Sequence, residues 1–198
     1  FKKVTLVYNG ANAFQFDFLS QYPQIKSVLW CPPAGQTGFS ALGEVLAGDV
    51  NPSGKTSDTF VKDLTKTAVF NNTDGTAAGN ASSVGTNGKF TYDNADDLAA
   101  SYMGFSGDKV TVTPTFVNYV EGIYVGYKFY ETAADEGLIN YDDTVMFPFG
   151  YGLSYTTFKQ EMGKVSYKNG KISFDVTVTN TGDKAGKDVV EVYYNPPY

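Results

Sequence analysis

The sequence predicts an α/β fold, a parallel-type sheet with helices, followed after about residue 155 by strands of a β-sandwich. Near the N-terminus, strand, helix, strand, loop and helix patterns follow one another, which is the order of an α/β unit. Near the C-terminus, apolar and polar residues alternate with the period of half-buried strands. Hydrophobic residues make up 42% and charged residues 18% of the 198 residues, as in globular proteins.

The first elements are short and separated by clear stop signals. Residues 3–8 (KVTLVY) predict a strand that ends at the turn signal of residues 9–10 (NG). Residues 14–19 are mostly apolar and precede Pro23, so we expect a short helix that stops at the proline. Residues 25–30 (IKSVLW) predict the second strand, which would lie parallel to the first.

A second helix is predicted after a Pro- and Gly-rich loop. Apolar residues recur on one helical face of residues 39–46, and Thr37 is placed to cap the helix through its hydroxyl. A glycine at position 43 costs a helix about 1 kcal/mol relative to Ala. We interpret its presence as a sign that this helix lies close to the sheet. Gly48 suits the residue that closes a helix, and residues 51–54 (NPSG) predict a turn.

The middle of the chain changes character. Small and polar residues dominate residues 71–109, which predicts a long surface loop or insertion with weak structure. This region holds glycosylation-type triplets at Asn71 and Asn80, a pattern that is common by chance. The aromatic cluster of residues 116–130 predicts core and interdomain packing, and residues 147–155 form a loop rich in Pro, Gly and aromatic residues.

The last 40 or so residues predict strands only. Residues 172–178 alternate between apolar and polar side chains, and residues 168–171 (KNGK) carry a hairpin signal. Residues 180–183 predict a turn, and residues 189–194 predict the start of a further strand. About three strands cannot close a β-sandwich, which needs about seven, so we expect only the first strands of one.

Composition excludes several classes of function. The chain has no histidine, so Ser-His-Asp and Cys-His catalysis within it are excluded, and we expect neither a metal nor a cofactor. The net charge of −6 argues against nucleic acid or an anionic membrane surface as the main partner. The single cysteine, Cys31, follows an apolar strand and is expected to be a buried structural residue.

The chain offers no targeting signal. No apolar run approaches the length of about 18 residues that predicts a transmembrane helix. The first residue is Phe1 and no leader precedes it, so we expect sequence upstream of it. The sequence is compatible with both a cytoplasmic and a secreted protein of bacterial type.

Glu121 and Trp30 each allow a functional and a structural interpretation. Glu121 lies among aromatic residues, where a desolvated carboxyl can serve as an acid, but we favour a structural carboxylate bonded to the backbone or to Lys128. Trp30 could stack on a sugar, but a core position at the end of a strand is favoured.

The other acidic residues predict structural roles. Residues 142–143 and 96–97 are adjacent Asp pairs, whose side chains would point to opposite faces of a strand. We interpret both pairs as solvated turns. Asp49 is expected to cap the turn at Asn51.

The segments in this order resemble the glycoside hydrolase family 3 enzymes, the β-glucosidases and their relatives. The resemblance covers nearly the whole chain except residues 61–117. It rests on residues 35–38 (GQTG), 48–55 (GDVNPSGK), 119–127 (YVEGIYVGY), 147–155 (FPFGYGLSY), 176–182 (VTVTNTG) and 185–190 (AGKDVV).

The resemblance implies a domain arrangement. The family has a TIM-like barrel, then an α/β sandwich, then a fibronectin-III-like β-sandwich. Residues 1–155 resemble the C-terminal part of the α/β sandwich domain, with residues 71–109 as a polar insertion. Residues 156–198 resemble the N-terminal strands of the fibronectin-III-like domain, and we expect the catalytic barrel to be absent from this chain.

The resemblance also implies a retaining mechanism, which needs two carboxyl groups about 5 Å apart. The family's nucleophile is an Asp of the barrel and its acid/base is a Glu of the sandwich domain. Both are expected upstream of residue 1, so no catalytic residue is assigned within the chain. Gln36, at the carboxyl end of a predicted strand, is the one candidate for substrate binding.

The expected function is therefore a fragment of a retaining β-glycosidase that is inactive alone. The expected partner of the whole protein is a carbohydrate with a terminal β-linked sugar. The alternative is a non-catalytic carbohydrate-binding or interaction module on the same fold. The fragment is expected to self-associate through surface that the barrel would cover. Thr37, Phe39 and residues 56–57 depart from the family pattern and leave the sugar specificity open.

Overall fold

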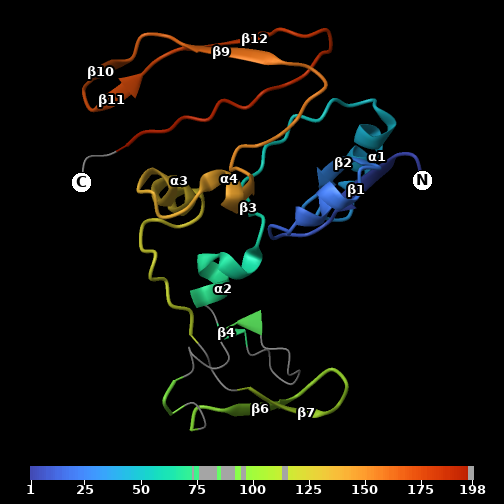
Figure 1. Ribbon diagram of the computed structural model, residues 1–198, viewed down its shortest axis with the longest axis vertical. Coiled ribbons are helices and arrows are strands. Elements are labelled where there is room, and N and C mark those ends of the chain that lie inside the picture. The colour runs from blue at the N-terminus through green and yellow to red at the C-terminus, as the bar shows by residue number, and fades with distance from the viewer. Residues whose placement is uncertain (73, 76–83, 86–91, 95–96, 113–115, 196–198) are drawn as a thin grey trace. The chain divides into compact units, whose positions relative to one another are not determined.

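The computed structural model describes residues 1–72, 74–75, 84–85, 92–94, 97–112 and 116–195 (Figure 1). The chain forms two compact units. Unit 1 comprises Phe1–Ala13, Leu19–Thr59 and Phe147–Tyr198, and unit 2 comprises Phe14–Phe18 and Phe60–Met146.

Unit 1 begins with the predicted pair of parallel strands. Strand β1 (Val4–Tyr8) pairs with β2 (Ile25–Trp30), which confirms both strands and their parallel direction. The pairing places Tyr8 opposite Trp30, and the backbone N–H of Cys31 donates to the Tyr8 carbonyl at 2.8 Å. The loop that leads to the next helix therefore starts at the carboxyl end of β2, as the sequence predicts.

The segment between the two strands is not the predicted helix of residues 14–19. It forms the short 3-10 helix η1 (Asp17–Gln21). Phe14, Phe16 and Phe18 instead pack on one another, with ring centroids 5.1–6.4 Å apart. These three rings are spaced by two residues, and a spacing of two does not place side chains on one face of an α-helix.

The second predicted helix is α1 (Phe39–Ala47), and Gly48 ends it with a left-handed φ of 85° as expected. The cap prediction for Thr37 is wrong, because the N-cap residue is Gly38 and no side chain caps the helix. The interpretation of Gly43 is also wrong. A Cβ added there would meet nothing within 4 Å, so no close approach to a sheet requires glycine.

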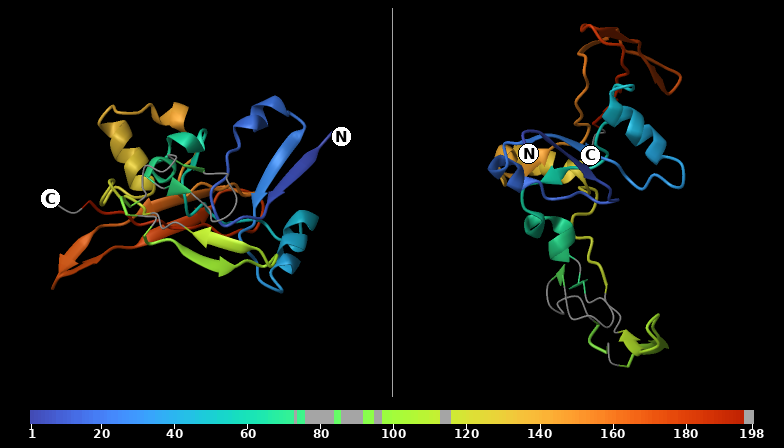
Figure 2. Two further views of the ribbon diagram at one scale, coloured as in Figure 1. Left: turned by 90° about the horizontal axis from the view of Figure 1, so that it is seen from below. Right: turned by 90° about the vertical axis from the view of Figure 1, so that its right-hand side faces the viewer.

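The C-terminal strands of unit 1 form two separate pairs. Strand β9 (Phe158–Met162) pairs antiparallel with β12 (Val176–Asn180), and the two lie side by side in Figures 1 and 2. Strands β10 (Ser166–Lys168) and β11 (Lys171–Ser173) form the predicted hairpin. Its tip, Asn169 and Gly170, has φ of 53° and 73°, the left-handed values that a type I′ turn requires.

Two strand predictions in this region fail. Residues 172–178 are not one strand, because residues 174–175 interrupt the strand between β11 and β12. At this interruption the carbonyl of Asp175 accepts from the N–H of Gly163 at 2.8 Å. Residues 189–194 form no strand. Their link to β9 runs through a side chain, since Gln160 Nε2 donates to the Val189 carbonyl at 3.0 Å, and a side-chain bond does not make a ladder.

Unit 2 is built from short elements. Its described strands form three pairs: β3 with β8, β4 with β5, and β6 with β7, the last two pairs antiparallel. The elements are β3 (Phe60–Val61), η2 (Leu64–Lys66), α2 (Ala68–Asn72), β4 (Asp74–Gly75), β5 (Val84–Gly85), β6 (Ala100–Met103), β7 (Lys109–Val112), α3 (Tyr127–Asp135), α4 (Tyr141–Thr144) and β8 (Val145–Phe147).

The polar region of residues 71–109 is only partly described. Its described part includes the strands β4 and β5 and the strand β6, which forms a hairpin with β7 (Figure 2). The prediction of weak structure did not include the hairpin that begins at the end of this region. The glycosylation-type triplet at Asn80 lies outside the described residues.

The core of unit 2 is small and aromatic. Phe16 and Phe60 are each 2% exposed and their rings stack 6.0 Å apart. Val61 and Val145, which lie in the paired strands β3 and β8, are also buried. Burial of each such side chain contributes about 1.5–3 kcal/mol to the stability of the unit.

The fold class is thus mixed α/β, with helices and small sheets, as predicted. The domain boundary at residue 155 stays a prediction, because unit 1 combines residues from both sides of it. Within the described residues, no helix is both long and apolar enough to span a membrane.

Candidate functional site

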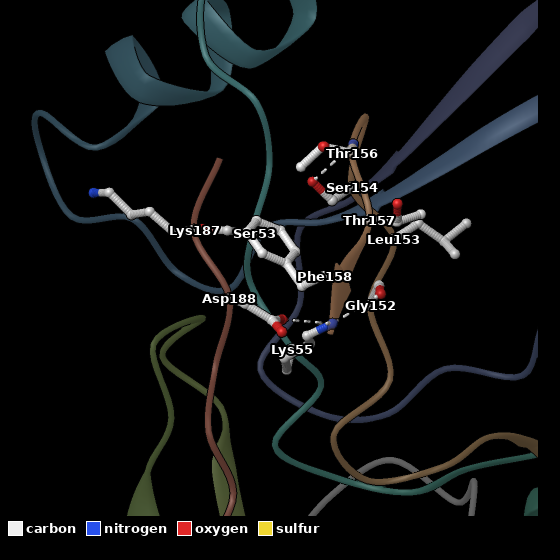
Figure 3. Close-up of a pocket in the computed structure, with 10 residues that line it drawn as sticks. All are labelled: Ser53, Lys55, Gly152, Leu153, Ser154, Thr156, Thr157, Phe158, Lys187 and Asp188. Atoms are coloured by element: carbon white, nitrogen blue, oxygen red, sulfur yellow. Dashed lines mark hydrogen bonds and ion pairs between the residues drawn. The ribbon is translucent and has the colours of Figure 1, made fainter. Parts of the chain in front are cut away.

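A pocket of about 320 Å³ lies within unit 1 (Figure 3). Three segments line it: the turn after α1, the loop that leads into β9, and the chain after β12. The lining residues are Ser53, Lys55, Gly152, Leu153, Ser154, Thr156, Thr157, Phe158, Lys187 and Asp188.

Backbone bonds hold the first two segments together. The N–H of Thr56 donates to the Tyr151 carbonyl at 2.7 Å, and the N–H of Gly150 donates to the Thr56 carbonyl at 2.8 Å. The Thr56 hydroxyl donates to the Pro148 carbonyl at 2.7 Å and accepts from the Tyr151 N–H at 3.0 Å. Thr56 therefore fixes the turn of residues 51–55 against the loop of residues 147–155.

Gly152 allows the two backbones to touch. A Cβ at this position would lie against the carbonyl oxygen of Gly54, nearer than real Cβ atoms come to backbone. The Gly152 carbonyl in turn accepts a hydrogen bond from Lys55 Nζ at 3.1 Å. Glycine is needed here for space, and its carbonyl helps to orient the lysine in the pocket wall.

Asn51 joins all three segments. Its Oδ1 accepts from the Ser154 hydroxyl at 3.0 Å and from the Tyr155 N–H at 2.9 Å. Its Nδ2 donates to the Ala185 carbonyl at 3.0 Å. The sequence prediction treated Asn51 only as part of a turn. The available signal was the tendency of Asn to bond backbone groups, which does not identify distant partners.

Lys55 and Asp188 line the pocket as an ion pair, and Gln160, which is not among the lining residues, bonds Asp188. Asp188 Oδ1 lies 3.7 Å from Lys55 Nζ, and its Oδ2 accepts from Gln160 Nε2 at 2.7 Å. The hydrogen bond from Gln160 is the largest cause that lowers the pKa of the Asp188 carboxyl. Burial opposes this shift, and the backbone of Val189 and the charge of Lys55 add to it. Asp188 is therefore ionised at neutral pH and is not a proton donor.

The pocket offers hydrogen bonding and one ring but no acid–base pair. Figure 3 shows Lys55 and Asp188 pointing toward each other, whereas the Lys187 side chain points away. Asp188 is the only carboxylate among the described residues that line the pocket. Among the described residues, no group of three or more His, Cys, Asp or Glu is arranged to hold a metal ion.

The predicted substrate-binding residue is not part of this pocket. Gln36 lies exposed in the turn before α1, near the carboxyl end of β2, and is absent from the lining residues. Its role stays a prediction. Trp30, in contrast, is partly buried, and its Nε1 donates to the Gly10 carbonyl at 2.8 Å, which suits a structural position. Cys31 is a free thiol of intermediate burial, less enclosed than predicted.

The other candidate acids lie on surfaces or in structural bonds. In unit 2, Asn72 Nδ2 donates to Glu121 Oε2 at 3.0 Å. The partner of Glu121 is therefore Asn72, whereas the prediction named the backbone or Lys128. Asp142 and Asp143 are exposed in the first turn of α4, a short helix rather than a turn.

The last two candidate positions are Asp49 and the Asp pair of residues 96–97. Asp49 is exposed. Of residues 96–97, Asp96 lies outside the described residues.

Comparison with known sequences gives one consistent answer. Residues 1–155 match the sequence profile of the Glycosyl hydrolase family 3 C-terminal domain. Beta-glucosidase A of Butyrivibrio fibrisolvens is 32% identical over 100% of this chain and 20% of its own length. The beta-glucosidase of Ruminococcus albus is 30% identical over 100% of this chain and 16% of its own. The chain thus spans a fifth or less of these two curated relatives.

Solved structures agree with the sequence comparison. Beta-glucosidase 3B from Thermotoga neapolitana in complex with glucose has a TM-score of 0.60 and 27% identity, covering 93% of this chain and 20% of its own. Beta-glucosidase from Kluyveromyces marxianus in complex with glucose has a TM-score of 0.56 and 28% identity, covering 91% and 16%. The resemblance seen in the motifs is therefore confirmed, and the chain belongs to glycosyl hydrolase family 3, with residues 1–155 matching its C-terminal domain.

Proposed function

We propose that this chain is the C-terminal part of a retaining β-glucosidase that hydrolyses terminal β-linked sugars. The observation that carries the proposal is similarity over the full chain to a protein named beta-glucosidase A, at 32% identity. Two solved relatives are described as complexes with glucose, which supports a glucose-type substrate for the whole enzyme. Residues 1–155 would be the C-terminal part of its α/β sandwich domain, and residues 156–198 the first strands of its fibronectin-III-like domain.

We further propose that residues 1–198 alone do not hydrolyse glycosides. A retaining mechanism needs a nucleophile and an acid/base about 5–5.5 Å apart. The pocket of unit 1 contains Asp188 without a second carboxylate among its described lining residues. Glu121 is bonded to Asn72 in unit 2. The chain would therefore supply scaffold around an active site whose carboxylates come from elsewhere in the enzyme, and Gln36 remains the candidate for contact with the sugar.

The first experiment measures aryl β-glucoside hydrolysis by purified residues 1–198. We expect no turnover above the uncatalysed rate, and the Glu121→Gln and Asp188→Asn variants should be equally inactive. Turnover that Glu121→Gln abolishes would show that the catalytic pair has been placed wrongly. Turnover that only Asp188→Asn abolishes would contradict the scaffold role of the pocket.

A second experiment tests the parent activity. Residues 1–198 would replace the aligned segment of beta-glucosidase A of Butyrivibrio fibrisolvens. We expect the chimera to hydrolyse an aryl β-glucoside, and the same enzyme without the segment to be inactive. A chimera that melts cooperatively yet lacks activity would contradict the proposal, because the fold would be present without its function.

Binding of a sugar without hydrolysis is the second candidate function. The favouring observation is the pocket itself, which Ser154, Thr156 and Thr157 line together with Phe158. Their hydroxyls bond Asn51, Asn180 and Thr181, and each hydroxyl oxygen keeps a lone pair that can accept from a sugar hydroxyl. Hydroxyl groups and an aromatic face are suited to a pyranose ring. Titration with glucose should then perturb the pocket residues by NMR, and Phe158→Ala should remove the effect while Phe39→Ala should not. Absence of any perturbation at high sugar concentration would eliminate this candidate.

The exposed apolar surface supports one more proposal, self-association of the chain. Helix α1 has no buried residue, and Phe39 and Leu46 on it are 51% and 52% exposed. A helix of nine residues has little stability unless an apolar face is covered. A second copy of the chain is the occupant that we propose for this face.

A further inference from the structure

Two Asn-Gly pairs lie in the described part of the chain, and their surroundings differ. One is Asn9-Gly10 at the end of β1, and the other is Asn169-Gly170 at the tip of the β10–β11 hairpin. In such a pair the backbone nitrogen of glycine can attack the side-chain amide carbon of the preceding asparagine. Glycine makes this attack easier because it has no side chain to block the approach.

The Asn169-Gly170 pair is open on all sides. Both residues are exposed, and a Cβ built on Gly170 would meet nothing within 4 Å. Within the described residues, neither the Asn169 side-chain amide nor the Gly170 N–H has a hydrogen-bond partner. The two groups that must meet are therefore not held away from each other by other bonds.

The hairpin that carries this pair is weak. It consists of three residue pairs in a sheet of its own, and every residue of β10 and β11 is exposed. An isolated two-stranded hairpin is marginally stable, so its turn opens at little cost in free energy. The last pair sets Lys168 opposite Lys171, and two like charges in register weaken the hairpin further.

The same two lysines favour the reaction. The attacking nitrogen of Gly170 loses its proton, and negative charge develops between the two residues as the new bond forms. Ammonium groups on both sides of the turn stabilise that charge by Coulomb attraction.

The Asn9-Gly10 pair is held in place. Asn9 Nδ2 donates to the Cys31 carbonyl at 2.7 Å, and the Gly10 carbonyl accepts from Trp30 Nε1 at 2.8 Å. The space beside Gly10 is filled by the Tyr8 ring, whose hydroxyl donates to the Asn12 carbonyl at 2.9 Å. These bonds oppose the rotation that would bring the side-chain amide of Asn9 to the nitrogen of Gly10.

We propose that Asn169 is a site of spontaneous deamidation and that Asn9 is protected. The nitrogen of Gly170 bonds to Cγ of Asn169, the Cγ–Nδ2 bond breaks, and ammonia leaves with the proton of the Gly170 N–H. Water then opens the cyclic imide at either carbonyl and yields aspartate or isoaspartate, with no oxidation or reduction. The product has one carboxylate more, so the net charge of the chain becomes one unit more negative than −6. Isoaspartate also lengthens the backbone by one carbon, which a two-residue turn cannot accommodate.

The test is incubation of the intact chain at mildly alkaline pH and physiological temperature. Chymotryptic peptides that contain residues 168–174 and 9–14 are then followed by mass spectrometry, with isoaspartyl methyltransferase labelling to identify the iso product. We expect the peptide with Asn169 to convert several times faster than the peptide with Asn9, and isoaspartate to be formed. Equal rates at the two sites would overturn the proposal.

A matched variant tests the role of the charges. In Lys168→Gln with Lys171→Gln, conversion at Asn169 should slow several-fold while the rate at Asn9 stays unchanged. A synthetic peptide of residues 166–173 gives the rate without the fold. If Asn169 in the intact chain keeps its amide while this peptide converts, the hairpin protects the site and the proposal is wrong.

Discussion

At the scale of single residues, Asn51 does more than its place in a turn suggests. One side chain bonds the loop residues Ser154 and Tyr155 and the carbonyl of Ala185. The stability of unit 1 should therefore depend on this amide.

Replacement of Asn51 by Ala should lower the free energy of unfolding of unit 1 by about 2 kcal/mol, since an intramolecular hydrogen bond contributes about 0.5–1.5 kcal/mol. Trp30 is the only tryptophan of the chain and lies in unit 1, so its fluorescence in urea reports this transition. The control Asp49→Ala changes an exposed residue two positions away and should shift stability by less than about 0.5 kcal/mol. Equal effects of the two variants would contradict the role of Asn51.

Asp188 predicts a dependence of stability on pH. Its folded-state pKa is lowered, chiefly by the hydrogen bond from Gln160, so the unfolded chain takes up the proton first as the pH falls. The stabilisation is complete above the unfolded-state pKa of about 3.9 and is lost as the pH falls through the lower folded-state pKa.

The measurement is the free energy of unfolding of the natural chain and of Asp188→Asn between pH 7 and pH 3. The natural chain should be more stable by about 1.5 kcal/mol at pH 7, the lower end of the contribution of one hydrogen bond to a charged group. The difference should shrink below about pH 4. Gln160→Ala removes the largest cause of the shift and should weaken this dependence. A difference that stays constant across the range would contradict the assignment.

At the scale of elements, α1 contains a glycine that the structure does not require. A Cβ at Gly43 meets no atom within 4 Å, whereas Gly48 has a φ of 85° that an L-residue adopts only with strain. The two glycines of one helix therefore predict opposite effects of the same substitution.

Gly43→Ala should raise the free energy of unfolding of unit 1 by about 1 kcal/mol, because alanine has the higher helix propensity. Gly48→Ala is the matched control and should lower it by about 1 kcal/mol. Thermal melts followed by circular dichroism and Trp30 fluorescence compare the two. The melts use dilute protein, so that they report the single chain. If Gly43→Ala destabilises the single chain, then another part of the same chain covers α1 at this position.

Predictions for the elements succeeded where a short pattern is sufficient. The strands β1 and β2, the left-handed Gly48 and the turn at Asn169-Gly170 follow from alternation or from the need for positive φ. The predictions failed where the apolar residues fit both the helical period of 3.6 residues and the two-residue period of an extended chain. The three Phe residues of 14–18 have a period of two within an apolar run, and their packing on one another overrides the helix.

At the scale of the whole molecule, the uncovered apolar face of α1 predicts association of two copies of the chain. Sedimentation velocity should show a weight-average mass that rises with protein concentration above that of a monomer. Phe39→Lys with Leu46→Lys places charges on this face and should restore the monomer. The control Glu44→Lys adds one charge on the same helix and should have little effect. A monomer at all concentrations would contradict the proposal.

The sequence by itself determined the fold class, the family and the lack of histidine chemistry, because these depend on periodicity, motif order and composition. The tertiary structure decided which side chains meet in the pocket. Lys55 bonds the carbonyl of Gly152, 97 residues away, and Asn51 bonds Ser154, 103 residues away. A polar side chain shows that a partner is needed, but only the folded backbone brings a particular partner within about 3 Å.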